Sequence, residues 1–247
     1  MQSEHLSLAP IKEAIIEFRF NQKIDLANIF NLEKKLPSGY SGFQSVVQQE
    51  FGFSFQDGEI QTTDAGRGVV SGYRSDNESL KTVVIFESDK FIFSKLAPYT
   101  NWNDLKSQAM NIWQIFKPSK DLGFSRIATR YVNEINLPIV DGELDFDEYL
   151  TICPKIPKGM PDILIGFLSK VAVPYYDEGI TATVTLSSGN LPPHPNKLSV
   201  MLDIDIFRAG QLALSDRELW AAMDILRDVK NTAFFGSITE KTKELCR

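Results

Sequence analysis

The sequence predicts an α+β fold made of two related units, each an antiparallel sheet with one long helix, packed into one compact protein. Three observations support this prediction. Segments with the two-residue period of a β-strand dominate the chain, turn sequences separate them, and a long segment with helical period occurs in each half. A chain of 247 residues with 43% hydrophobic content can bury a core in one large domain or in two smaller ones.

The first half begins with an expected strand over residues 12–20, in which apolar and polar residues alternate. Asp25 is a suitable N-cap for a helix that we expect to extend to Leu36. Four further strands are expected over residues 44–56, 68–74, 80–87 and 90–96. The Asp-Gly, Ser-Asp and Asn-Glu connectors between them are typical turn sequences, so an antiparallel meander is the simplest topology.

A long helix is expected after Thr100, which can cap it, and Lys117-Pro118 should end it. Its apolar residues form one stripe: Trp102, Leu105, Ala109, Ile112, Trp113 and Phe116.

After this helix, strands are expected over residues 125–138, 180–186 and 198–207. Ser215 and Glu218 form a capping box that should open a second long helix. One face of that helix carries Leu219, Ala222, Met223, Leu226 and Ala233. Ser237 and Glu240 suggest another box, which would open a short terminal helix.

A short sequence echo suggests that the two halves arose by duplication. Val84–Phe91 and Val200–Phe207 both precede a long helix, and their alignment places Glu87 and Asp89 on Asp203 and Asp205. Such echoes also arise by chance in β-rich chains. On this hypothesis the units are residues 1–138 and 139–247.

Composition argues against several classes of function. The net charge of −6 disfavours nucleic acid as a partner, because phosphate binding needs clustered Lys and Arg. The sequence has no apolar stretch of membrane-spanning length and its first residues do not resemble a signal peptide, so we expect a cytoplasmic protein that does not bind membranes. Cys153 and Cys246 have no ligand-spaced partner, and no cofactor is expected. His5 and His194 lie outside any recognisable catalytic pattern.

The expected strand over residues 125–138 carries the candidate binding residues Arg126, Arg130, Tyr131 and Asn133. Arg130 and Glu134 are too far apart on one strand to pair, so Arg130 needs a partner from another element, for which Asp203 or Glu87 is suited. The first interpretation is a structural clamp between the two halves, and the second is a ligand site. If the clamp exists, Arg130→Ala should lower thermal stability.

Asp203 and Asp205 lie two residues apart and should share one face of a strand. Together they could hold a divalent metal. The alternative hypothesis is therefore a metal-dependent hydrolase or nuclease-like enzyme that uses these two carboxylates. The favoured interpretation is a solvent-facing row opposite the buried residues Leu202, Ile204 and Ile206.

Five segments carry a resemblance to a known family: Leu8–Phe20, Ala97–Trp102, Arg130–Asn133, Leu202–Asp205 and Phe234–Thr239. They resemble a family of roughly 250 residues that is scattered sporadically among bacteria, has an Arg-Tyr-Val/Ile-Asn motif and has no assigned activity. The resemblance therefore implies no catalytic residue. A patchy distribution is typical of genes on mobile or defence-related loci, including toxin–antitoxin partners and immunity factors.

Together these observations predict a non-catalytic regulatory protein whose partner is another protein, bound through an apolar groove or a sheet edge. The sequence leaves the partner's identity and the oligomeric state open.

Overall fold

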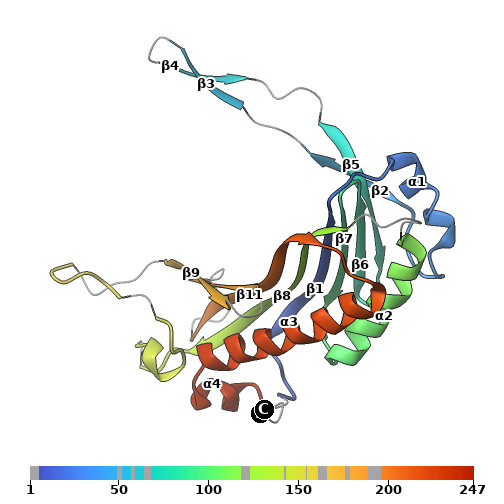
Figure 1. Ribbon diagram of the computed structural model, residues 1–247. Helices are drawn as coiled ribbons and strands as arrows, with labels where there is room; N and C mark the ends of the chain where they lie inside the picture. Colours follow the sequence, from blue (N-terminus) through green and yellow to red (C-terminus); the bar gives the residue numbers. More distant parts are fainter. Residues whose placement is uncertain are drawn as a thin grey trace.

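The computed structural model describes residues 6–48, 68–117, 123–141, 143–153, 155–160, 166–175, 179–188 and 196–247, and the backbone of residues 52–56 and 59–63. The described residues form an α+β fold, as predicted (Figure 1).

The strands form one continuous antiparallel sheet of nine strands in the order β2-β5-β6-β7-β1-β8-β11-β10-β9. Their bounds are β1 Ile11–Phe20, β2 Gln44–Gln48, β5 Val69–Asn77, β6 Thr82–Glu87, β7 Lys90–Leu96, β8 Phe124–Pro138, β9 Leu168–Tyr175, β10 Ile180–Ser188 and β11 Lys197–Leu212. A separate two-stranded sheet contains β3 (Gly52–Gln56) and β4 (Glu59–Thr63). The expected strand over residues 44–56 is therefore two strands in different sheets.

The sheet extends outward on both sides of the central pair of β1 and β8. Moving outward from β1, the strands are β7, β6, β5 and β2, and moving outward from β8 they are β11, β10 and β9. A long helix follows β7 and another follows β11. The 125–138 segment thus occupies the centre of the sheet, where it pairs with β1 and β11.

The two long helices are α2 (Trp102–Phe116) and α3 (Asp216–Ser237), and both have the predicted apolar faces. The capping box of Ser215 and Glu218 is confirmed at the start of α3. At α2 the cap is Asn101, whose side chain accepts from the Asp104 amide, so the prediction of Thr100 was one residue early. Thr100 instead donates a hydrogen bond to the Asp104 carboxylate.

Two shorter helices differ from their predictions. Asp25 caps α1 as expected, but α1 (Leu26–Phe30) ends after five residues, and a 3-10 turn over Glu33–Lys35 follows. The terminal helix α4 (Glu240–Leu245) begins after Thr239. Ser237 is no cap, because it is the last residue of α3 and donates its hydroxyl to the Ala233 carbonyl.

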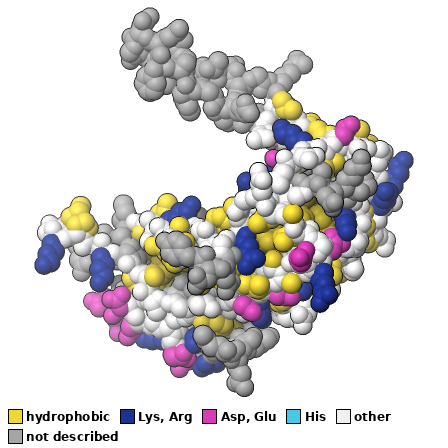
Figure 2. Space-filling view, in the orientation of Figure 1, with side chains coloured by type: hydrophobic (Ala, Val, Ile, Leu, Met, Phe, Trp, Pro, Cys, Tyr) yellow, Lys and Arg dark blue, Asp and Glu magenta, His cyan; other side chains and the backbone are white. Residues whose placement is uncertain are grey.

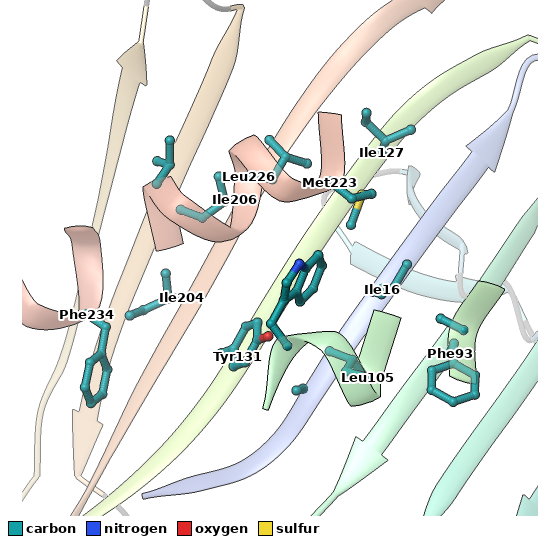
Figure 3. Close-up of a cluster of buried hydrophobic side chains, with 14 of the residues drawn as sticks. Ile16, Phe93, Leu105, Ile127, Tyr131, Ile204, Ile206, Met223, Leu226 and Phe234 are labelled. Carbon is teal, nitrogen blue, oxygen red and sulfur yellow. The ribbon is translucent and has the colours of Figure 1, made fainter. Parts of the chain in front are cut away.

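Both long helices lie on one face of the sheet (Figure 1), which we call the helix face. Trp113 of α2 packs edge-on against Phe18 of β1, and α3 lies across β8, β10 and β11. The core lies between these layers, where Tyr131 lies among apolar side chains of the strands, of α2 and of α3 (Figure 3). We call the other side of the sheet the open face, because no described helix covers it (Figure 1).

The sequence echo does not correspond to equivalent elements. Val84–Phe91 covers the end of β6, a turn and the start of β7, whereas Val200–Phe207 lies inside the single strand β11. A hairpin turn therefore aligns with continuous strand, so Glu87 and Asp89 are not counterparts of Asp203 and Asp205.

Across the part of the chain that the structure describes, none of the helices combines the length and the apolar character needed to cross a bilayer.

Candidate functional site

The four candidate residues of β8 divide between the two faces of the sheet. Arg126 and Arg130 are an even number of residues apart and point to the open face, whereas Tyr131 and Asn133 point to the helix face and are buried. The structure therefore does not bring the predicted binding residues together. Each pair has to be assessed with its own neighbours.

Arg126 is the centre of an ionic network that joins three strands across the open face. Its Nη2 atom lies 2.8 and 2.7 Å from the two carboxylate oxygens of Asp205 on β11, and Nη1 donates to Glu17 on β1. The guanidinium also lies 4.5 Å from the ring centroid of Phe207. With 17% of its side chain exposed, Arg126 ties β1, β8 and β11 together at a site largely removed from water.

Arg130 pairs with Asp203, one of the two partners that the sequence suggested. Its Nε and Nη2 atoms lie 2.8 and 2.5 Å from the two oxygens of Asp203, a bidentate geometry. Half of the Arg130 side chain is exposed, compared with 23% for Asp203. The predicted pairing of Arg130 with Asp203 is confirmed, and it joins β8 to β11. The guanidinium of Arg130 is the more exposed of the two groups.

Electrostatics differ between the two carboxylates of Arg126. Burial raises the pKa of Asp205 above its ordinary value, and Arg126 only partly offsets that effect. Burial also acts to raise the pKa of Glu17, but the hydrogen bonds and charges of Arg19 and Arg126 outweigh it, so the pKa of Glu17 lies below its ordinary value. Arg126 therefore holds one strongly stabilised carboxylate and one that is costly to keep ionised.

In three ion pairs of the open face the guanidinium is the more exposed partner. Exposed side-chain fractions are 49% for Arg19 against 15% for Glu17, 50% for Arg130 against 23% for Asp203, and 44% for Arg74 against 33% for Asp76. Partly buried apolar side chains lie on the same face of the sheet between these pairs, namely Ile15, Ile85, Ile92, Val132 and Phe207. The face thus combines apolar patches with outward-facing arginines.

Charges are mixed on the side of the molecule that Figure 2 shows, where Lys and Arg side chains alternate with Asp and Glu without one continuous basic patch.

On the helix face, Tyr131 and Asn133 have structural partners. The Tyr131 hydroxyl lies 3.1 Å from that of Tyr99, and burial raises the pKa of both phenols. The Asn133 Nδ2 atom donates to the backbone carbonyls of Tyr131 and Leu202. Asn133 also lines a cavity beside α3, described below, and the Tyr131 ring contacts the ammonium of Lys230, which lines the same cavity.

The metal alternative placed a divalent ion on Asp203 and Asp205. These carboxylates share the open face, as predicted, and each is bound to a guanidinium. Over the described ranges, no group of three or more His, Cys, Asp or Glu side chains is arranged to hold a metal ion.

His5 and His194 lie outside the described residues. Burial raises the pKa of the thiols of both Cys153 and Cys246, so neither is an activated nucleophile.

Glu17 and Arg19 are members of the open-face network that the sequence reasoning did not single out. Both lie on the polar face of β1, opposite Ala128 and Arg126 of β8. Their opposite charges at a spacing of two residues were the available signal, because such residues share one face of a strand.

Comparison with known proteins adds no further constraint: no family model matches the chain, and no curated protein matches it.

Proposed function

We propose that this chain is a non-catalytic regulatory protein that binds another protein on the open face of its sheet. One observation carries the proposal: arginines face outward near the centre of the open face. Arg19 and Arg130 are each bound to a carboxylate that is less exposed than the arginine itself. Arginine is enriched at protein interfaces, where it combines an apolar stem with a planar hydrogen-bonding group.

The extent of the open face supports a macromolecular partner. Nine strands at about 4.8 Å spacing span roughly 40 Å, and a ten-residue strand such as β1 is about 33 Å long. A standard interface buries about 800 Å² on each partner, which this face exceeds. A small molecule would contact only a small part of it.

The charge layering supports an acidic surface on that partner. The carboxylates of the open face are partly satisfied by the arginines above them, whereas Arg19, Arg74 and Arg130 direct their exposed groups outward. Complementary charge would orient the partner and accelerate association.

The finer predictions from the sequence belong to the same proposal. The long helix that follows β7 and the one that follows β11 support two related units, which the sequence predicts as residues 1–138 and 139–247. The resemblance to the sporadically distributed bacterial family supports a role at a mobile or defence-related locus, as a toxin–antitoxin partner or an immunity factor.

Charge reversal on one face tests the proposal. Purified wild-type protein is used to capture partners from cells that express it, and the captured protein is then produced separately and titrated against variants. Arg130→Glu and Arg19→Glu should weaken binding at least tenfold. The control Lys35→Glu, at an exposed lysine of the 3-10 turn after α1, should bind like the wild type.

Equal binding by all three variants, or chemical footprints on α2 and α3 instead of β1, β8 and β11, would show that the partner docks elsewhere. A captured nucleic acid with steep salt dependence would replace protein as the ligand class.

A further inference from the structure

A cavity of about 130 Å³ lies on the helix face, separate from the open face. Its wall is formed by the segment before β1, the residues leading into α2, Asn133 of β8 and the last turns of α3. An engineered apolar cavity of about 150 Å³ accommodates benzene, so this cavity has the size for a small organic group. It is too small for a folded domain or a nucleotide.

Lys230 is the unusual residue in this wall. Its side chain belongs to α3, and the residue is 8% exposed. The ammonium Nζ lies 2.6 Å from the Asn231 amide oxygen and 4.1 Å from the ring centroid of Tyr131. Among the described residues, no carboxylate lies within ion-pair distance of it. Asp228 is the nearest candidate on its helix, and it is bound to Arg227 at 2.8 Å.

A buried amine without a counterion is costly to keep charged. Burial, and then the charge of Arg227, lower the pKa of Lys230 to about 7. The amine is therefore close to half protonated at neutral pH, and a negatively charged ligand in the cavity would restore its charge.

Arg227 provides a second cation in the same wall. Its bond to Asp228 uses Nη1, one part of a guanidinium that has five N–H donors. Apolar side chains also line the cavity, namely Leu6, Ile11, Trp102, Phe234 and Phe235, together with polar ones such as Asn101 and Asn133. The lining thus combines cationic and apolar groups, which suits an amphipathic anion.

We propose that this cavity, which we call the Lys230 pocket, binds a small monocarboxylate whose carboxyl group lies against Lys230 and Arg227 and whose apolar body contacts the aromatic wall. A carboxylate matches the planar guanidinium, and one carboxyl group with a short chain or one ring fits the volume. The proposal concerns a different face of the sheet from the protein partner and does not depend on it.

Binding should depend on pH through Lys230. The groups around its amine are Arg227 and Asp228 of α3, Tyr131 of β8 and, through Tyr131, Tyr99. Burial raises the pKa of both tyrosines, so they stay protonated over the pH range of the test. From pH 6 to 9 the protonated fraction of Lys230 falls, so affinity for a carboxylate should fall at least tenfold.

The test uses benzoate and butyrate as probes, with benzamide and butyramide as neutral controls of the same shape, in calorimetric titrations of the whole chain at pH 6 and pH 9. The acids should bind at millimolar concentration at pH 6 and the amides should not. Near pH 8, binding should take up close to one proton, which titrations in two buffers of different ionisation enthalpy measure.

Two variants place the binding at this pocket. Lys230→Met should abolish benzoate binding. Arg227→Gln, which keeps Lys230, should weaken benzoate binding severalfold, and it provides the test if Lys230→Met fails to fold. Lys35→Met should bind benzoate like the wild type. Equal binding of benzamide and benzoate, retention of affinity at pH 9, or no binding of either acid would overturn the proposal.

Discussion

The two faces of β8 deal with positive charge in opposite ways. On the open face, Arg126 and Arg130 each have carboxylate partners, and the more buried arginine has two. On the helix face, Lys230 lies over Tyr131 with no carboxylate partner among the described residues. The paired cations stabilise the fold, whereas the unpaired cation costs stability.

This difference indicates separate purposes for the two faces. A fold under no other constraint would place an apolar residue at position 230, because methionine or leucine fits the same helix position without desolvating a charge. Natural proteins tolerate such local conflicts mainly at functional sites. The unpaired Lys230 therefore supports the proposed small-ligand site, and the paired, outward-facing arginines support the proposed docking surface on the open face.

The largest expected effect is a gain of stability in Lys230→Met. Burial lowers the folded-state pKa of Lys230 from its ordinary value of 10.5 to about 7. Native protein therefore binds fewer protons than unfolded protein between these values, and stability rises with pH across that window. Lys230→Met should stabilise by about 3 kcal/mol at pH 7, which allows for about 1 kcal/mol lost from the contact with Tyr131.

Urea unfolding at pH 7 and pH 9 measures the effect, and the gain should shrink by about 2 kcal/mol at pH 9. Lys106→Met is the matched control, because Lys106 of α2 is 2.7 Å from the Asp224 carboxylate and should show no such gain. An equal change at both pH values would mean that the pKa of Lys230 is not lowered in the folded protein, so that the buried amine stays protonated across this range.

Arg126→Ala should produce an effect of similar size and opposite sign, a loss of about 3 kcal/mol, because it leaves the carboxylates of Glu17 and Asp205 without their shared partner. Arg126→Lys keeps the charge but loses the bidentate geometry, so its free energy of unfolding should lie between those of the wild type and Arg126→Ala. A double-mutant cycle with Asp205→Asn separates the contribution of that pair. A loss smaller than that of Arg130→Ala would contradict the burial argument.

Arg130→Ala should cost only about 0.5 to 1 kcal/mol, because half of its side chain is exposed and water screens its pair with Asp203. The sequence predicted that this substitution lowers thermal stability, and the exposure of Arg130 limits the expected loss to a modest one. A variant that unfolds almost like the wild type but no longer binds a protein partner would favour the docking role of Arg130. A large loss of stability with binding intact would favour the clamp.

Local sequence patterns predicted much of the fold and half of the candidate site. The apolar stripe of α2, the capping box of α3 and the solvent-facing row of Asp203 and Asp205 depend on spacing within one element, and all are found. The pairing of Arg130 with Asp203 followed from the need of a central strand arginine for a carboxylate on a neighbouring strand.

The remaining features depend on which elements become neighbours. The single nine-stranded sheet requires β1 and β8 to pair across more than a hundred residues, which periodicity does not report. The two-residue period of a strand already implies that Arg130 and Tyr131 point to opposite faces of the sheet. The four residues of β8 therefore could not form one site. Lys230 also left a signal, because it continues the apolar row of Leu219, Met223 and Leu226 on α3, although its burial comes from distant segments.

The smallest expected effect concerns metals. Mg²⁺, Mn²⁺ and Ca²⁺ at millimolar concentration should leave the melting temperature unchanged, because a metal at Asp203 and Asp205 would first have to displace two guanidinium groups. Arg126→Ala and Arg130→Ala combined sharpen the test, since they free both carboxylates without removing them. If the double variant is stabilised by a metal and the wild type is not, the arginines exclude metal from the open face. Stabilisation of the wild type itself would instead revive the hydrolase alternative, because a native-state ligand must stabilise by mass action.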